Sequence, residues 1–299
     1  MSLMKRNHNI LSVLFVGFAG LLAISSCNRL DVLGMVVNRS DTEERVADWL
    51  DWDNQHDPFV IDSVPDAYDF YSCSDVHHND DNTRLATYIT KERNDPQAVF
   101  SILAGDLANE SGERPYILCE EAMAFDPAIH AENDPCFPII GNHDVYYNCA
   151  ESYKQHFHTS TYTVTVKTLG GYQDLFVFLD SGNGTHGHRQ LEWLEQQLSH
   201  RSEYRYCFVI SHNWLFRTSY NYTTTPASNL PEDEQYAFMD LMSQNEVDMV
   251  VMGHFHYRDA KTFGGVKYVM TDNLNEGKET PSFMVVHCGE TIQYEYRSL

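Results

Sequence analysis

The sequence predicts a mixed, α+β fold, in which strands and helices alternate along one large domain. From residue 59 onward, short apolar runs of strand length alternate with segments whose apolar residues recur at helical spacing. The composition is that of a globular protein, since 42% of the 299 residues are hydrophobic and 13% are aromatic. No repeat or long internal linker divides this part, so we expect residues 58–299 to form one domain.

The predicted strands share apolar or β-branched side chains over about five to eight residues. They are residues 68–73, 97–103, 136–140, 161–167, 174–179, 204–211, 247–252, 266–270, 283–287 and 291–296. Helices are predicted between them, at residues 82–93, 115–129, 150–157, 187–200 and 232–244. The clearest is 187–200, which carries Leu191, Leu194 and Leu198 at spacings of three and four. The helix at 82–93 is expected to be capped by Asn82 or Asp81.

The N-terminus has the features of a targeting segment. Lys5 and Arg6 precede a nearly unbroken apolar run at residues 10–24. This run is shorter than the roughly 18 residues that a membrane-spanning helix needs. It leads into Leu22-Ala23-Ile24-Ser25-Ser26-Cys27, which resembles a bacterial lipobox. We therefore expect residues 1–27 to be a lipoprotein signal peptide, with cleavage before Cys27 and a lipid anchor on that residue. The alternative is an uncleaved signal anchor.

Such processing predicts an exported lipoprotein, anchored in the bacterial cell envelope on the periplasmic or cell-surface side. Residues 28–57 are polar and acidic, and we interpret them as a tether between the lipid and the folded domain. A short helix near residues 42–50 and the side chains of Trp49 and Trp52 are expected to order part of this tether.

The charge balance excludes one class of partner. Lys and Arg total 20 against 43 Asp and Glu, which gives a formal net charge of −23. A surface of this charge repels phosphate backbones, so we expect no nucleic-acid partner and disfavour a nuclease. A local cationic site made by bound metal ions is compatible with the same net charge.

The cysteines allow two interpretations. Export permits disulfides, and three cysteines are close enough in sequence to pair: Cys119, Cys136 and Cys149. The other three lie in apolar strand-like runs, where buried free thiols are expected: Cys73, Cys207 and Cys288.

Side chains that can bind metal follow five of the predicted strands. The five segments are Asp75-Val76-His77, Gly105-Asp106, Gly141-Asn142-His143-Asp144, His212, and Gly253-His254-Phe255-His256. Loops at strand ends are where α/β architectures place ligand sites. Any one of these segments could be an ordinary polar turn, because Gly, Asn and Asp are common turn residues. Histidine has no such preference for turns. The occurrence of five such segments in one chain therefore favours a functional site.

This ordered series resembles the calcineurin-like metallophosphoesterase family, with its blocks D-x-H, G-D, G-N-H-D, a lone H, and G-H-x-H. The resemblance extends from about residue 68 to the C-terminus. It implies an α/β/β/α sandwich of two mixed β-sheets flanked by helices. It also implies a binuclear metal centre that hydrolyses phosphate esters through attack by a bridging hydroxide.

The family pattern assigns a role to each matching residue of this chain. Asp106 would bridge the two metal ions. The first ion would be bound by Asp75, His77, Asp106 and His256, and the second by Asp106, Asn142, His212 and His254. His143 would act on the substrate without binding metal, as general acid and transition-state stabiliser, and Asp144 would orient it.

These residue types suit the expected chemistry. A phosphate ester is anionic, so an attacking hydroxide needs charge neutralised on both sides, which two metal ions provide. Neutral imidazoles and the Asn142 carbonyl keep the centre positive, and a protonated His143 can donate to the leaving oxygen. Mn, Zn and Fe all accept this ligand set.

Each residue also has an ordinary structural explanation. Asp75 and Asp106 could cap helices, His212 could be a core histidine, and one of His254 and His256 could face solvent. Among the remaining histidines, His78 is expected at the rim or in solvent. His186 and His188 are expected in a flexible polar loop, with a place lining the pocket as the alternative.

Two departures from the family pattern concern the substrate site. His212 is followed by Asn213 and Trp214, whereas relatives often carry proline at the second of these positions. Asn109 stands where purple acid phosphatases place a tyrosine that binds ferric iron, which argues against that type of centre. Asn109 is therefore a candidate substrate contact. Residues 217–232 are predicted to form a pocket wall with Arg217 as a phosphate contact, the alternative being a surface excursion.

The sequence therefore predicts a lipid-anchored, metal-dependent phosphoesterase whose substrate is a phosphate ester. Monoesterases and diesterases share this centre, so both remain open. The alternative is a non-catalytic lipid-anchored binding protein that reuses the fold. His143 and Asp144 favour the enzyme, because a binding protein needs no acid for a leaving group.

Overall fold

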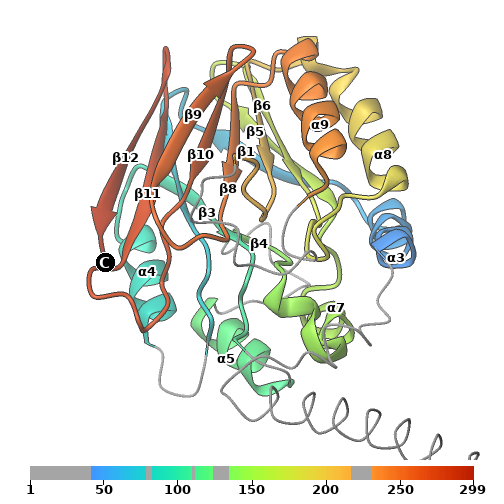
Figure 1. Ribbon diagram of the computed structural model, residues 1–299. Helices are drawn as coiled ribbons and strands as arrows, with labels where there is room; N and C mark the ends of the chain where they lie inside the picture. Colours follow the sequence, from blue (N-terminus) through green and yellow to red (C-terminus); the bar gives the residue numbers. More distant parts are fainter. Residues whose placement is uncertain (1–41, 79–82, 110–111, 124–134, 217–229) are drawn as a thin grey trace, which may run out of the picture. The chain divides into compact units, whose positions relative to one another are not determined.

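The computed structural model describes residues 42–78, 83–109, 112–123, 135–216 and 230–299, which lie in one compact unit (Figure 1). The described strands form two mixed β-sheets, and helices cover the outer face of each sheet. This arrangement is the predicted α/β/β/α sandwich. None of the described helices is both long and apolar enough to span a membrane.

The smaller sheet has five strands in the order β12-β11-β2-β3-β4. In chain order these are β2 (Tyr68–Cys73), β3 (Ala98–Ala104), β4 (Cys136–Ile139), β11 (Ser282–Cys288) and β12 (Ile292–Ser298). Strands β2, β3 and β4 are parallel, whereas β11 is antiparallel to both of its neighbours. The carboxyl ends of β2, β3 and β4 therefore lie at the same edge of the sheet.

The larger sheet has seven strands in the order β1-β5-β6-β7-β8-β10-β9. In chain order these are β1 (Phe59–Val64), β5 (Tyr162–Thr168), β6 (Gln173–Phe178), β7 (Tyr206–Ile210), β8 (Met249–Met252), β9 (Asp259–Phe263) and β10 (Val266–Met270). Strands β6, β7, β8 and β10 are parallel to one another. Their carboxyl ends form the second edge from which site residues emerge.

An aromatic layer fills the space between the two sheets. Phe70 stacks on Phe100 in the smaller sheet, with ring centroids 5.2 Å apart, and Phe176 stacks on Phe208 in the larger sheet at 4.6 Å. The two pairs meet edge to face, with 5.2 Å between the rings of Phe70 and Phe176. All four side chains are fully buried, so this layer fixes the relative positions of the two sheets.

Helices bury the outer face of each sheet. Figure 1 shows α8 (His188–Leu198) and α9 (Glu232–Gln244) beside the larger sheet. The smaller sheet is covered by α4 (Arg84–Arg93), α5 (Arg114–Met123) and α7 (Ala150–Phe157). Two short 3-10 helices, η1 (His143–Asn148) and η2 (Arg201–Glu203), complete the regular structure of the described residues.

Residues 42–55, which the sequence assigned to the tether, form a helix that belongs to the folded body. This helix, α3 (Thr42–Gln55), begins with acidic Glu43 and Glu44, which suit the positive end of a helix dipole. Arg45 makes two hydrogen bonds to the buried carboxylate of Asp180, at 2.6 and 2.9 Å. Trp49 is fully buried and donates to the same carboxylate at 2.9 Å. The predicted tether is therefore too long at its C-terminal end.

The sequence located most of the remaining elements. The helices at 150–157 and 232–244 and the strand at 266–270 have the predicted bounds, and most other elements agree within one to three residues. Two strands were not specified, β1 and β9, which lie at the edges of the larger sheet. The predicted signal peptide with Cys27, residues 28–41, the caps Asp81 and Asn82, and residues 124–129 lie outside the described residues.

The cysteines of the described residues are free and buried. Cys119, Cys136 and Cys149, whose spacing would permit a disulfide, are therefore not paired in the structure, and the expected burial of Cys73, Cys207 and Cys288 is confirmed. Burial raises the pKa of the Cys136 thiol to about 12, which keeps it protonated and unreactive.

Candidate metal centre

The loops that follow β2, β3, β4, β7 and β8 converge on one cluster of side chains. Three overlapping groups of potential metal ligands lie there, with the donor atoms of each group within 4.8 Å of one another. Their members are Asp75, His77 and His256; His77, Asp106 and His143; and Asp106, His212 and His254. Asn142 joins the third group, because its Oδ1 lies 3.1 Å from His212 Nε2. The structure thus brings all seven predicted ligands together.

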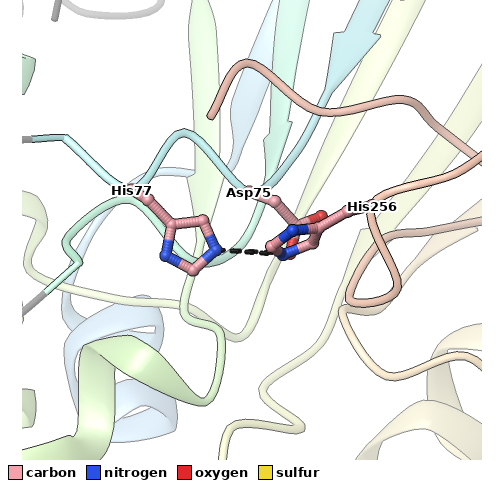
Figure 2. A group of neighbouring side chains, drawn as sticks. All are labelled: Asp75, His77 and His256. Atoms are coloured by element: carbon pink, nitrogen blue, oxygen red, sulfur yellow. Dashed lines mark hydrogen bonds and ion pairs between the residues drawn. The ribbon is translucent and has the colours of Figure 1, made fainter. Parts of the chain in front are cut away.

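The first group is held by residues from both sheets (Figure 2). His256 Nε2 lies 3.1 Å from His77 Nε2 and 3.2 Å from Asp75 Oδ1, so three donor atoms face one small space. The other carboxylate oxygen of Asp75 accepts hydrogen bonds from the Ser74 hydroxyl and the His254 backbone N–H. These bonds hold the carboxylate and leave Oδ1 directed at the two imidazoles.

The group formed by Asp106, His212, His254 and Asn142, called the second group from here on, is more deeply buried. His212 Nε2 lies 3.3 Å from Asp106 Oδ2, and its Nδ1 lies 2.8 Å from the carbonyl oxygen of Ala104. A carbonyl only accepts, so Nδ1 carries the hydrogen and Nε2 is the nitrogen directed at the site. His254 completes the group, with its ring centroid 5.2 Å from that of His212.

Asp106 connects the two groups. Its Oδ2 lies 3.3 Å from His212 Nε2 and 3.7 Å from His77 Nε2, although these imidazoles belong to different groups. Its other oxygen accepts a hydrogen bond of 2.7 Å from the backbone N–H of His143. One carboxylate is therefore fixed between two sets of donors, which is the position that a bridging ligand requires.

Several donor atoms have no hydrogen-bond partner among the described residues, although they are buried. They are Asp75 Oδ1, His77 Nδ1, and both ring nitrogens of His254. A buried polar atom without a partner costs about 1–3 kcal/mol, so four in one site would be expensive for a purely structural cluster. A bound cation would satisfy Asp75 Oδ1 and one nitrogen of His254, so the residues fit a metal centre of imidazole, carboxylate and amide ligands.

Burial sets the charge state of two imidazoles. It lowers the pKa of His77 to about 4 and that of His254 to about 3, so both are neutral near pH 7 and can bind metal. Although burial also opposes the charged form of His212, the Asp106 carboxylate raises the pKa of this residue to about 9. Metal binding at His212 would therefore release a proton.

The two carboxylates are ionised because nearby imidazoles outweigh the effect of burial on their pKa values. Burial alone would raise the pKa of Asp106, but the imidazoles of His212 and His143 hold it well below its usual range. Burial would also raise the pKa of Asp75, but the imidazoles, chiefly that of His256, lower it. Both side chains thus carry the negative charge that a cation needs.

His143 lies between the groups and is half-buried. Its ring centroid is 4.4 Å from that of His77, and its Nδ1 lies 3.0 Å from the carbonyl oxygen of Asn109. This carbonyl can only accept, so Nδ1 carries a hydrogen and the ring is held in one orientation. Asn109, predicted as a substrate contact, thus orients His143 through its backbone.

Asp144 does not orient the His143 ring in the predicted way. Its carboxylate accepts hydrogen bonds from the backbone N–H groups of Gly141, Leu107 and Ala108, at 2.8, 3.1 and 2.9 Å. Burial raises the pKa of Asp144 to about 6, and the charge of Asp106 adds to this effect. The role that the structure shows is to tie the loop after β3 to the turn after β4.

The backbone at the site is unusual. Five site residues with side chains have positive φ: Asp75 (50°), His77 (46°), Asp106 (55°), His254 (84°) and His256 (59°). This left-handed region is disfavoured for residues other than glycine, and such residues concentrate at functional sites. This strained backbone conformation lets nearby residues of one short loop direct their side chains towards the same site.

Gly141 is required because the turn after β4 approaches Asp106 closely. A Cβ atom at this position would lie 2.3 Å from both the backbone nitrogen and Oδ1 of Asp106. Only glycine lets the turn after β4 lie against the Asp106 carboxylate.

Sequence reasoning missed the residues that support His256. The side chains of Asn273 and Lys278 both donate to its backbone carbonyl oxygen, at 2.8 and 2.9 Å. Lys278 also pairs with the buried carboxylate of Asp272 at 2.8 Å. These residues follow β10, so the rule that found the other loops, polar side chains at the end of a parallel strand, would have found this one.

Two other histidines differ from expectation. His78 is buried, and its backbone bridges to Ala108 rather than lying at the rim. His186 is fully buried, stacks on Phe238 with centroids 4.7 Å apart, and lies 3.0 Å from the Ser211 hydroxyl. It belongs to the packing of α9, not to a flexible loop. Arg217, the predicted phosphate contact, lies outside the described residues.

Fold and site together define a sandwich protein with a cluster of histidine and aspartate side chains, suited to binding metal, at the carboxyl ends of its strands. The family follows from the sequence comparison, in which residues 69–258 match the model of the calcineurin-like phosphoesterases. This match covers more than half of the chain, so the protein belongs to the calcineurin-like phosphoesterase family. Family membership and the donor groups together imply bound divalent metal ions. No curated protein matches the sequence.

Solved structures share the fold at low sequence identity. A dimetal phosphatase from Danio rerio is similar with a TM-score of 0.55 and 11% identity, over 81% of this chain and 97% of the other. The purple acid phosphatase PPD1 from yellow lupin has a TM-score of 0.59 and 13% identity, over 78% of this chain and 52% of the other. GAP50, the anchor in the inner membrane complex of Plasmodium, has a TM-score of 0.58 and 14% identity, over 78% and 84%.

Proposed function

We propose that the protein hydrolyses phosphate esters with two metal ions that share the Asp106 carboxylate. The observation that carries this proposal is the position of Asp106 Oδ2, 3.3 Å from His212 Nε2 and 3.7 Å from His77 Nε2, between two sets of ligands. A single ion would need only one set. The similar dimetal and purple acid phosphatases support the proposal at the level of the fold.

The first metal ion would be held by Asp75, His77, Asp106 and His256, and the second by Asp106, Asn142, His212 and His254. When bound, the ions would neutralise the phosphoryl oxygens and supply an activated water as nucleophile. The chain's own contribution is to fix seven ligands on two sheets.

His143 would deliver the proton. Its Nδ1 hydrogen is directed at the Asn109 carbonyl, so Nε2 is the atom that can hold and transfer a proton to the leaving oxygen. The half-buried ring lies beside His77 at the edge of the first group, within reach of a bound ester. Positioned general acids of this kind contribute about 10²- to 10⁴-fold to the rate.

A non-catalytic binding protein is the competing function, and one experiment separates the two. The protein is loaded with Mn²⁺, its metal content is measured, and hydrolysis of p-nitrophenyl phosphate and of bis-p-nitrophenyl phosphate is followed. We expect two ions and hydrolysis of at least one ester. Asp106→Asn should lose metal and activity together, whereas His143→Ala should keep both ions and lose about 10²- to 10⁴-fold in rate.

The result that would overturn the enzymatic function is equally direct. Wild-type protein that carries two ions and hydrolyses neither ester is a binding protein. The similar Plasmodium protein GAP50 is described as an anchor, so a non-catalytic role is the alternative that this experiment tests.

We also propose that the mature protein is exported and held at the cell envelope by a lipid on Cys27, because the segment ending at this residue resembles a lipobox.

A further inference from the structure

Tyr146 lies beside the second group of ligands, in the 3-10 helix η1 that directly follows the Gly141 turn. Its phenol oxygen accepts a hydrogen bond of 3.0 Å from Asn142 Nδ2. Its ring centroid is 5.0 Å from that of His143, and the side chain is half-buried. Neither the sequence motifs nor the proposed mechanism gives this tyrosine a role.

The bond matters because an asparagine amide has two different ends. Only the oxygen can bind a cation, whereas the NH₂ group would repel it. In the structure the oxygen of Asn142 lies 3.1 Å from His212 Nε2, inside the second group, and the NH₂ group is taken by the Tyr146 phenol. Asn142 is only 3% exposed, so solvent cannot supply an equivalent acceptor freely.

The backbone of the turn is held independently of the phenol. The N–H of Val145 donates to the carbonyl of Asn142 at 3.3 Å, and the N–H of Cys149 donates to the carbonyl of Tyr146 at 3.0 Å. Val145 is also buried in the adjacent hydrophobic core. Loss of the Tyr146 hydroxyl should therefore leave η1 folded and affect the Asn142 amide alone.

We propose that Tyr146 is a positioning residue that fixes the amide of Asn142, so that Oδ1 faces the metal site formed with Asp106, His212 and His254. The proposal rests on the proposed function in that it takes this group to be the second metal site. Tyr146 sets the affinity of that site by removing the alternative amide orientation, in the way that partners of metal ligands commonly do.

The test is a titration of Mn²⁺ into metal-free protein by isothermal calorimetry, with Tyr146→Phe and Asn142→Ala compared with wild type. We expect Tyr146→Phe to weaken the same binding step as Asn142→Ala, by about 10- to 100-fold, and to leave the other step unchanged. Tyr236→Phe is the matched control, because it removes an exposed phenol that contacts Glu232 in α9. This control should bind Mn²⁺ like wild type.

The double variant distinguishes positioning from a general structural effect. If Tyr146 acts only through Asn142, adding Tyr146→Phe to Asn142→Ala should weaken Mn²⁺ binding no further. Additive losses would overturn the proposal, as would a Tyr146→Phe protein that binds both ions like wild type. Electron paramagnetic resonance gives a second readout, since Tyr146→Phe at two equivalents of Mn²⁺ should lose the signal of coupled ions.

These measurements use no substrate, so they separate the two proposals. Hydrolysis of neither ester by wild type, together with a selective loss of one Mn²⁺ in Tyr146→Phe, would reject the enzymatic function and retain the role of Tyr146. Hydrolysis by wild type, together with unchanged Mn²⁺ binding in Tyr146→Phe, would retain the enzymatic function and reject the role of Tyr146. A wild-type protein that binds one ion, unaffected by Asn142→Ala, would reject both.

Discussion

Replacement of Arg45 by alanine tests whether α3 is part of the folded body. Arg45 is 6% exposed, and its guanidinium makes two bonds to the fully buried carboxylate of Asp180. The substitution would leave this carboxylate with two hydrogen bonds, from the Trp49 indole and from the Gly182 N–H, both 2.9 Å long. Removal of one partner from a buried ion pair costs about 3–5 kcal/mol. Because two donors remain, we expect the lower end of this range, about 3 kcal/mol.

The loss should depend on pH with a definite sign. In the wild type, burial opposes ionisation of Asp180 but Arg45 keeps its pKa below the usual value. A lowered folded-state pKa contributes stability above the unfolded-state value of about 3.9, and this contribution is lost as the pH falls. Without Arg45, burial would raise the pKa, so protonation would favour the folded state. The difference between the proteins should be largest near pH 7 and shrink towards pH 4.

The measurement is urea unfolding of both proteins at pH 7 and pH 4, followed by tryptophan fluorescence. Arg189→Ala is the control, because Arg189 is 58% exposed and lies 4.0 Å from Glu43 on the surface of the same helix pair. Exposed pairs contribute about 0–1 kcal/mol, so this variant should unfold almost like wild type. A loss below about 1 kcal/mol in Arg45→Ala, or a loss independent of pH, would refute the reasoning.

Four further outcomes are expected. Gly141→Ala should abolish Mn²⁺ binding, since its Cβ would lie 2.3 Å from Asp106 Oδ1, whereas Gly289→Ala, with 3.9 Å to its nearest atom, should bind normally; normal binding in both would contradict the steric argument. Asp144→Asn should lower the free energy of unfolding by about 2 kcal/mol, because an amide NH₂ would face N–H donors of the site loops; urea unfolding equal to wild type would contradict this. Chelation of the metal should lower the melting temperature, equivalent to about 2.7 kcal/mol for metal at 100 times its dissociation constant, and Mn²⁺ should restore it; a melting temperature that ignores both treatments would argue against a resident metal. Cys27→Ala expressed in bacteria should move the protein from the membrane to the soluble fraction and abolish palmitate labelling, and a variant still labelled would disprove lipidation at this residue.

The sequence located the cluster of potential metal ligands because the positions of these side chains depend on local patterns. A ligand such as Asp75 or His254 directly follows an apolar strand, and the carboxyl ends of parallel strands meet at one edge. The fold was predictable for a similar reason, since α8 and α9 carry apolar residues at helical spacing and the inner strands are short apolar runs. These properties need only a few neighbouring residues.

The remaining features depend on contacts between distant residues. Asp144 bonds to backbone groups 36 and 37 residues earlier in the chain, and nothing in its own segment indicates them. Arg45 and Asp180 are 135 residues apart, so the polar, acidic sequence around Arg45 did not indicate that this segment packs against the folded domain. His186 resembled a loop residue because its neighbours are Gly, Thr and Gly, whereas its burial comes from α9, 48 residues further on.

The strand order of the smaller sheet has a consequence for when the centre can form. Strand β2, which leads into Asp75 and His77, pairs on one side with β11, where His287 contacts Asp69 across 218 residues of chain. The His256 loop is also placed late in the chain and is supported by Asn273. The site around Asp75 and His77 therefore needs residues that are synthesised much later, and contacts between such distant residues form slowly. The candidate metal centre should then be complete only after β11 and the His256 loop have been synthesised.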